Sequence, residues 1–187
     1  QKGGDEVGKR ELPTLERCNE LLQGGTLLRE AGLTKEDLAI LKTYQLLTAK
    51  PMLIALNGDE TQLPGMEKYA DAIRREKGGK NTKVLSFFGK IELEMSELPV
   101  EEAALFMGEY GIRESALDTL LREAYDLLGL QSFFTVGEDE CRAWTIRKGM
   151  TAQESAGVIH SDFVNKFIRA EVVHYDDFMA HGASFAK

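Results

Sequence analysis

The chain has 187 residues, of which 43% are hydrophobic and 29% are charged, and its formal net charge is −8. This composition is ordinary for a globular protein, and the negative charge argues against broad, non-specific nucleic-acid binding. No apolar run approaches the roughly 20 residues of a membrane helix, and no signal peptide is recognisable. Two cysteines, Cys18 and Cys141, are too few for a disulfide framework, so we expect a cytoplasmic protein without a membrane partner.

Neither end of the sequence looks like the natural end of a protein chain. The chain begins with Gln1 rather than Met, and Lys187 follows shortly after a strand-like segment. We therefore expect these residues to be a piece of a longer protein.

The first part of the chain predicts two helices followed by a buried strand. Residues 9–22 place apolar side chains at three- and four-residue steps, as one arm of a helical hairpin does. Thr34, with Asp37 three positions on, predicts the start of a second helix. Residues 52–56 are all apolar, which is typical of a strand buried on both faces in a parallel sheet.

Residues 57–60, which follow this strand, read Asn-Gly-Asp-Glu. An Asn-Gly pair after a strand is usually only a turn. A binding role is also chemically reasonable, because an Asn side chain both donates and accepts, as the N6/N7 edge of adenine requires. Gly58 has no Cβ, so its backbone can approach a ring closely. The residues alone leave both interpretations open.

The middle of the chain predicts a parallel crossover. Residues 66–77 predict an amphipathic helix with Met66, Tyr69, Ala70 and Ile73 inward, and residues 83–88 predict the next strand. Shorter helices are expected over residues 91–98 and 100–110, and a longer one over residues 114–128.

The last part of the chain predicts the opening of a β-grasp (ubiquitin-like) module. Residues 131–136 and 142–146 predict a hairpin, and Gly149 is free to take a positive φ in the turn that follows. Thr151 precedes Glu154 by three residues, which is the spacing of a capping box. A further strand is expected over residues 168–173.

Charge is unevenly distributed in this last part, where residues 142–173 hold five basic and three acidic residues. Their pattern alone favours a solvated mixed surface. The functional interpretation is a small basic face for RNA or the ribosome. The basic residues are Arg142, Arg147, Lys148, Lys166 and Arg169.

Three stretches carry a family resemblance. R-A-W-T-I (142–146), A-G-V-I-H-S-D-F (156–163) and F-I-R-A-E-V (167–172) closely resemble the TGS domain that ends the YchF/Obg-like ATPases, a family of P-loop NTPases. Lys166 departs from the family, which often has Gly before the F-I-R-A run. A TGS domain from a tRNA synthetase or stringent-response enzyme fits poorly, because Asn-Gly-Asp-Glu after a buried strand has no place there.

The resemblance implies roles for residues near the strand ends. It makes Asn57-Gly58-Asp59-Glu60 the N-x-x-E form of a loop that usually reads N-K-x-D in P-loop GTPases, and this form goes with a preference for ATP over GTP. Asn57, Gly58 and Glu60 are thereby expected to shape the purine end of the pocket. Gly89 and Lys90 lie where the family has the loop that closes over the base from the other side.

The resemblance also implies cofactors and partners. The full-length protein is expected to hydrolyse ATP, and GTP less well, with Mg²⁺, and to associate with the ribosome. RNA contacts are expected through the TGS segment, without DNA specificity. No G-x-x-x-x-G-K-[ST] occurs in the sequence, so we expect neither hydrolysis nor tight nucleotide binding from these residues alone.

The expected organisation has three parts. Residues 1–32 end a helical insertion, residues 33–130 form the last part of an α/β P-loop nucleotide domain, and residues 131–187 form a truncated TGS domain. The three histidines and two cysteines lack metal-ligand spacing, and His160 is expected to form a hydrogen bond at a helix junction. The alternative function is a non-enzymatic TGS-type module that binds RNA or the ribosome or has a regulatory role.

Overall fold

The structure is a computed structural model that describes residues 6–112, 114–137 and 139–181. The chain divides into two compact units, Gln1–Leu128 and Gly129–Lys187. The first unit contains strands β1 (Met52–Asn57) and β2 (Thr82–Phe87), and short 3-10 helices at Leu28–Glu30, Leu47–Ala49 and Glu60–Gln62. Its α-helices are α1 (Glu6–Gln23), α2 (Lys35–Leu41), α3 (Leu63–Lys77), α4 (Gly89–Ser96), α5 (Val100–Glu109) and α6 (Ala116–Leu127).

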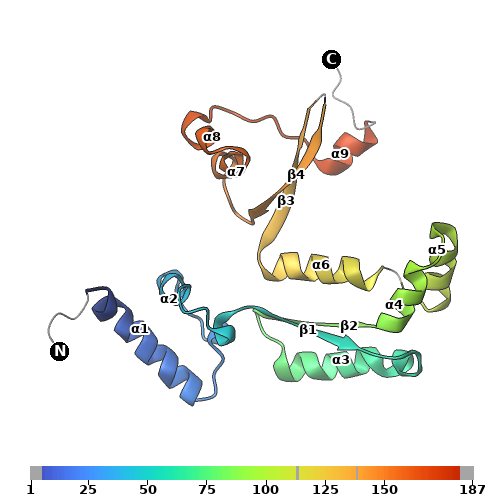
Figure 1. Ribbon diagram of the computed structural model, residues 1–187, viewed down its shortest axis with the longest axis horizontal. Coiled ribbons are helices and arrows are strands. Elements are labelled where there is room, and N and C mark those ends of the chain that lie inside the picture. The colour runs from blue at the N-terminus through green and yellow to red at the C-terminus, as the bar shows by residue number, and fades with distance from the viewer. Residues whose placement is uncertain (1–5, 113, 138, 182–187) are drawn as a thin grey trace. The chain divides into compact units, whose positions relative to one another are not determined.

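A strand–helix–strand unit lies at the centre of the first unit. β1 and β2 pair in parallel, from Met52 opposite Thr82 to Asn57 opposite Phe87. α3 connects them, and α3 and α6 lie on opposite sides of the strand pair, each in contact with β2 (Figure 1). The predicted parallel crossover is therefore confirmed. This parallel arrangement matters for function because it brings the carboxyl ends of β1 and β2 together at one edge of the sheet.

Two details of the burial prediction were wrong. β1 is half-buried rather than buried on both faces, because only β2 pairs with it among the described strands. On α3, Met66 and Ala70 are buried one turn apart, but Tyr69 is 58% exposed. The buried face of α3 therefore includes fewer residues than the apolar positions of its sequence predicted.

A separate small core joins the first two helices. Cys18, Leu28 and Leu41 are buried together. The predicted start of α2 is confirmed, because Thr34 and Asp37 form a reciprocal capping box. α2 ends at Leu41.

The second unit is built on an antiparallel hairpin. β3 (Leu130–Val136) pairs with β4 (Cys141–Arg147), α7 (Ala152–Ile159) contacts β4, and α8 (Ser161–Lys166) packs on α7. Gly149 has φ +86°, and Thr151 and Glu154 form the expected capping box. The hairpin and the helix start are thus as predicted.

The strand predicted over residues 168–173 is wrong. These residues have no regular secondary structure, and α9 (Tyr175–Ala180) follows them. Ile168 is 91% exposed and Val172 is 87% exposed. A strand is stabilised by its neighbour, and no described strand pairs with this segment. The chain is thus a mixed α/β protein, and the β-grasp assignment stays a prediction.

None of the helices that the structure describes is long and apolar enough to cross a membrane.

Candidate nucleotide-binding site

Two of the predicted purine contacts meet at the carboxyl ends of the paired strands. Asn57 is the last residue of β1, and Gly89 is the first residue of α4, just after β2. The Gly89 N–H donates to Asn57 Oδ1 at 3.0 Å. This bond ties the two loops that follow the strands, at the edge where parallel α/β sheets bind ligands.

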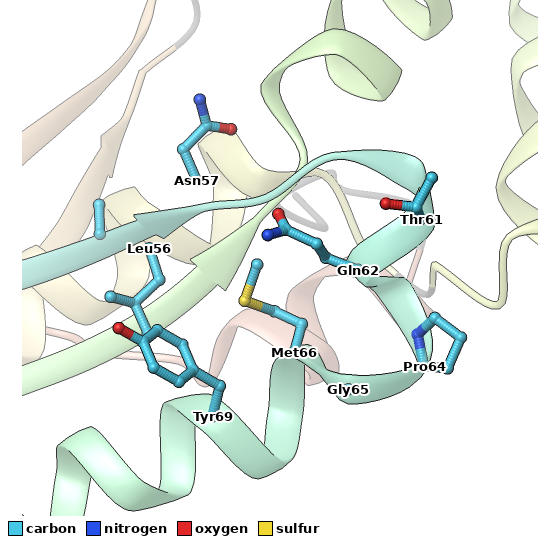
Figure 2. Close-up of a pocket in the computed structure, with 9 residues that line it drawn as sticks. Leu56, Asn57, Thr61, Gln62, Pro64, Gly65, Met66 and Tyr69 are labelled. Carbon is cyan, nitrogen blue, oxygen red and sulfur yellow. The ribbon is translucent and has the colours of Figure 1, made fainter.

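The Asn57 amide retains binding capacity after this bond is made. Its oxygen is occupied by Gly89, and no described residue accepts a hydrogen bond from its Nδ2 group. The side chain is exposed, and Figure 2 shows it pointing to the side of β1 opposite Leu56, Met66 and Tyr69. Two N–H donors are therefore held near the strand ends, where a ring nitrogen of a purine is a suitable acceptor.

Gly58 is buried in the turn that follows, and its N–H donates to the Phe87 carbonyl at 2.9 Å. A Cβ at this position would overlap the methyl group of Met66 and stand 3.0 Å from Phe88 Cε1. The space left by the missing Cβ of Gly58 is thus filled by the side chains of Met66 and Phe88 of this chain.

Asp59 fixes the backbone of the same loop. Its carboxylate accepts from the Thr61 N–H at 2.9 Å, while its own N–H donates to Gln62 Oε1 at 2.9 Å. The bond from the Thr61 hydroxyl is the main reason that the pKa of Asp59 is lowered. Sequence reasoning missed this cap, although Asp59 followed by Gln62 has the spacing of a capping box.

Glu60 and Lys90 each have a side-chain partner of their own. The Glu60 carboxylate accepts from the Tyr110 hydroxyl at 3.2 Å, and the Lys90 ammonium lies 3.8 Å from the Glu94 carboxylate. Both side chains are exposed. The structure therefore joins Asn57 to Gly89, whereas the side chains of Glu60 and Lys90 bind Tyr110 and Glu94.

An open hollow of about 540 Å³ lies between β1 and the start of α3. Leu56, Met66 and Tyr69 approach one another there, as Figure 2 shows. The rest of its lining comes from Ala55, Asn57, Thr61, Gln62, Pro64 and Gly65.

The predicted RNA contacts do not share one face. The Arg142 guanidinium lies 4.4 Å from the ring centroid of Trp144, on the face of β4 that also holds the buried Ile146. Arg147 belongs to the opposite face, because side chains alternate along a strand. Lys148 follows β4, Lys166 lies 3.8 Å from Asp162 at the end of α8, and Arg169 lies in the irregular segment before α9.

His160 has the structural role expected of it. Its Nδ1 accepts from the Asp162 N–H at 3.2 Å and caps α8. The described parts of the chain contain no cluster of three or more His, Cys, Asp or Glu residues that fits a metal ion.

Comparisons with known proteins agree on one family. Residues 130–187 match the family model YchF-GTPase_C, described as "Protein of unknown function (DUF933)". The chain is 42% identical over 184 residues to the ribosome-binding ATPase YchF of Bacillus subtilis (strain 168), covering 97% of this chain and 50% of that protein. It is 38% identical over 154 residues to Obg-like ATPase 1 of Rattus norvegicus, covering 81% and 39% respectively. The solved structure of the Schizosaccharomyces pombe YchF GTPase matches with a TM-score of 0.77 and 28% identity, covering 96% of this chain and 50% of that one.

The chain is a mixed α/β protein, and the relatives that it matches carry the names of nucleotide hydrolases. Within that class, the chain belongs to the YchF/Obg-like ATPase family, as its sequence resemblance indicated. It spans about half the length of the curated relatives it matches.

Proposed function

We propose that this chain supplies the purine end of the nucleotide site of a ribosome-associated P-loop ATPase. Asn57 donates to the base, Gly58 and Asp59 fix the loop, and Glu60 selects the base from its edge. Phosphate and Mg²⁺ positions are assigned to residues outside these 187, because the sequence contains no P-loop motif. ATP is the preferred substrate and GTP the poorer one.

The bond between Gly89 N–H and Asn57 Oδ1, 3.0 Å long, carries this proposal. It holds the Asn57 amide in one orientation and directs its oxygen inward to the protein. The amide N–H groups are then directed toward a ligand, so a base acceptor such as a ring nitrogen fits them. Preorganisation of this kind lowers the entropic cost of binding.

Asn57→Asp tests the proposal, because it keeps an acceptor for Gly89 and removes the two donors. We expect the affinity of the full-length protein for ATP to fall about tenfold, the loss of one well-placed hydrogen bond. The thermal midpoint should stay close to that of the wild type. Asn57→Ala removes both functions, so it should lower both the affinity and the midpoint.

Asn165→Asp, in the exposed part of α8, is the matched control for the added negative charge. Binding is measured by titration calorimetry at fixed salt and Mg²⁺. Unchanged ATP affinity in Asn57→Asp would contradict the proposal.

The second candidate function is a non-enzymatic module in residues 129–187 that binds RNA or the ribosome. It is supported by the name of the Bacillus subtilis relative, a ribosome-binding ATPase, and by the exposed Arg147 on the hairpin. Co-sedimentation with ribosomes in the absence of nucleotide, together with unaltered ATP binding in Asn57→Asp, would favour this module over the nucleotide site.

A further inference from the structure

Basic residues gather where α3 ends and β2 begins. Residues 74–83 contain five of them and a single acidic residue, Glu76, in a chain whose formal net charge is −8. A local excess of one charge on a protein of the opposite net charge indicates a surface that binds a polyanion. The five basic residues are Arg74, Arg75, Lys77, Lys80 and Lys83.

Three of these five cations are neutralised within the chain. Arg74, Lys77 and Lys83 each form an ion pair with a carboxylate of the first unit. Arg75 and Lys80 are exposed, and neither forms an ion pair with a described residue. Two cations of this stretch are therefore available to a partner.

The loop before β2 brings two more cations to the same place. Asn81 Nδ2 donates to the Arg29 carbonyl, and the Arg29 guanidinium donates to the Lys50 carbonyl. Arg29 is half-buried, and its Nε is a buried donor without a hydrogen-bond partner among the described residues. The Lys50 side chain is exposed and forms no ion pair with a described residue. Arg29 and Lys50 therefore lie beside the loop that contains Lys80.

One carboxylate opposes these four cations. Glu30 Oε1 accepts from the Thr82 hydroxyl at 3.0 Å, and a Cβ on Gly79 would overlap its carboxylate. The charge of the group stays positive. A cation in the last turn of a helix also offsets the helix dipole, which accounts for Arg75. It does not account for Lys80, which lies beyond the end of α3.

The four cations lie at the end of the strand pair opposite the candidate nucleotide site. Lys50 precedes β1, and α3 runs back to the amino end of β2, as Figure 1 shows. Asn57 ends β1 at the carboxyl edge, about 20 Å away along a strand of six residues. A partner bound to the cations therefore leaves the nucleotide end of the strands open.

We propose that Arg29, Lys50, Arg75 and Lys80 form a basic surface that binds the phosphate backbone of RNA. None of the four is aromatic, so the surface binds phosphates rather than stacking on bases. The inference rests on one part of the proposed function, the association with the ribosome, which makes RNA the polyanion. It places the RNA contact in the first unit instead of on the hairpin of the second.

A triple substitution in the full-length protein, Lys50→Gln with Arg75→Gln and Lys80→Gln, tests the inference. Arg29 is left in place because it holds the loop. The probe is a fluorescein-labelled, mixed-sequence single-stranded RNA, and anisotropy gives its affinity over a series of salt concentrations. We expect binding at low salt to weaken about tenfold. The slope of log affinity against log salt should become shallower by about two, since each lost phosphate contact removes about 0.7.

The matched control removes the same charge from three exposed lysines on or next to α1 and α2, namely Lys9, Lys35 and Lys42, each changed to Gln. Its salt slope should equal that of the wild type. An equal loss of RNA affinity in both triple variants would mean that only net charge matters and would overturn the inference.

Two further results would also overturn it. The first is unchanged RNA binding in the variant of the basic surface, with a loss when Arg147, Lys166 and Arg169 are changed to Gln instead, which would assign RNA to the second unit. The second is a loss of binding to phosphatidylserine vesicles with RNA binding unchanged, which would make the partner a membrane surface.

ATP affinity separates this inference from the proposed nucleotide site. The variant of the basic surface should bind ATP as the wild type does, and Asn57→Asp should keep the salt slope of RNA binding. If the basic-surface variant loses RNA binding while Asn57→Asp leaves ATP affinity unchanged, the nucleotide proposal fails and this inference stands.

Discussion

Asp37 links α2 to α1 through polar contacts. Its carboxylate accepts from the Thr34 N–H at 3.0 Å and the Thr14 hydroxyl at 3.1 Å, and it lies 3.2 Å from the Arg17 guanidinium. The residue is only 9% exposed. The Thr34 N–H is the main reason that the pKa of Asp37 is lowered, with the Thr34 hydroxyl next.

This lowered pKa predicts how acid acts on the first unit. A carboxyl group whose pKa is lower in the folded state contributes stability that is present above its unfolded pKa, near 3.9. That contribution is lost as the pH falls through the lower folded value. At pH 7 the wild type should therefore resist urea better than Asp37→Asn, and the gap between their midpoints should shrink below about pH 4. Far-UV circular dichroism measures both midpoints, and a gap that is independent of pH would contradict this assignment.

At the same scale, the sequence predicted only part of the arrangement around Asn57. Asn57 and Gly89 were predictable, because each follows a strand and parallel strands bring their carboxyl ends together. Glu60 was predicted as a base contact, but its partner Tyr110 was not. No periodicity or local motif links residues fifty positions apart, so only the packing of α5 discloses the pair.

At the scale of elements, helix starts are set by local hydrogen bonds. Thr34 with Asp37, Asp59 with Gln62 and Thr151 with Glu154 each form a reciprocal cap. The first and third were predicted, because a capping box needs only residues three apart and an apolar run behind them. The strand prediction for residues 168–173 was wrong because it depended on more than local sequence. The β-branched residues of this segment favour a strand, but a strand requires a partner.

The capping box of α7 should make a measurable contribution to the stability of the second unit. Thr151→Ala removes the oxygen that accepts from the Glu154 N–H, and we expect a loss of about 1 kcal/mol in the stability of the second unit. Thr151→Ser retains that oxygen and is the control. Trp144 fluorescence during urea unfolding reports the change, because α7 contacts the strand that contains Trp144. Equal midpoints for the Ala and Ser variants would show that the cap is not needed.

At the scale of the whole molecule, the division of the chain into two compact units predicts two unfolding events. Trp144 is the single tryptophan of the chain and lies in the second unit. Six of the described α-helices, including the three longest, lie in the first unit, so they dominate the circular dichroism signal. We expect the midpoints from fluorescence and from circular dichroism to differ.

Thr151→Ala sharpens this test, because it should move only the fluorescence transition. If both signals shift together in that variant, the units unfold as one and the prediction is wrong. The substitution is suited to the comparison because it leaves every residue of the first unit unchanged.

The placement of the two cysteines has a practical consequence. Cys18 is 2% exposed beside Leu28 and Leu41, and burial raises the pKa of its thiol, whereas Cys141 is exposed at the start of β4. Since the thiolate is the reactive form, a maleimide dye should attach to Cys141 first and reach Cys18 only when the core around it opens. The rate at which the second dye is incorporated would then time the opening of that core in the native protein.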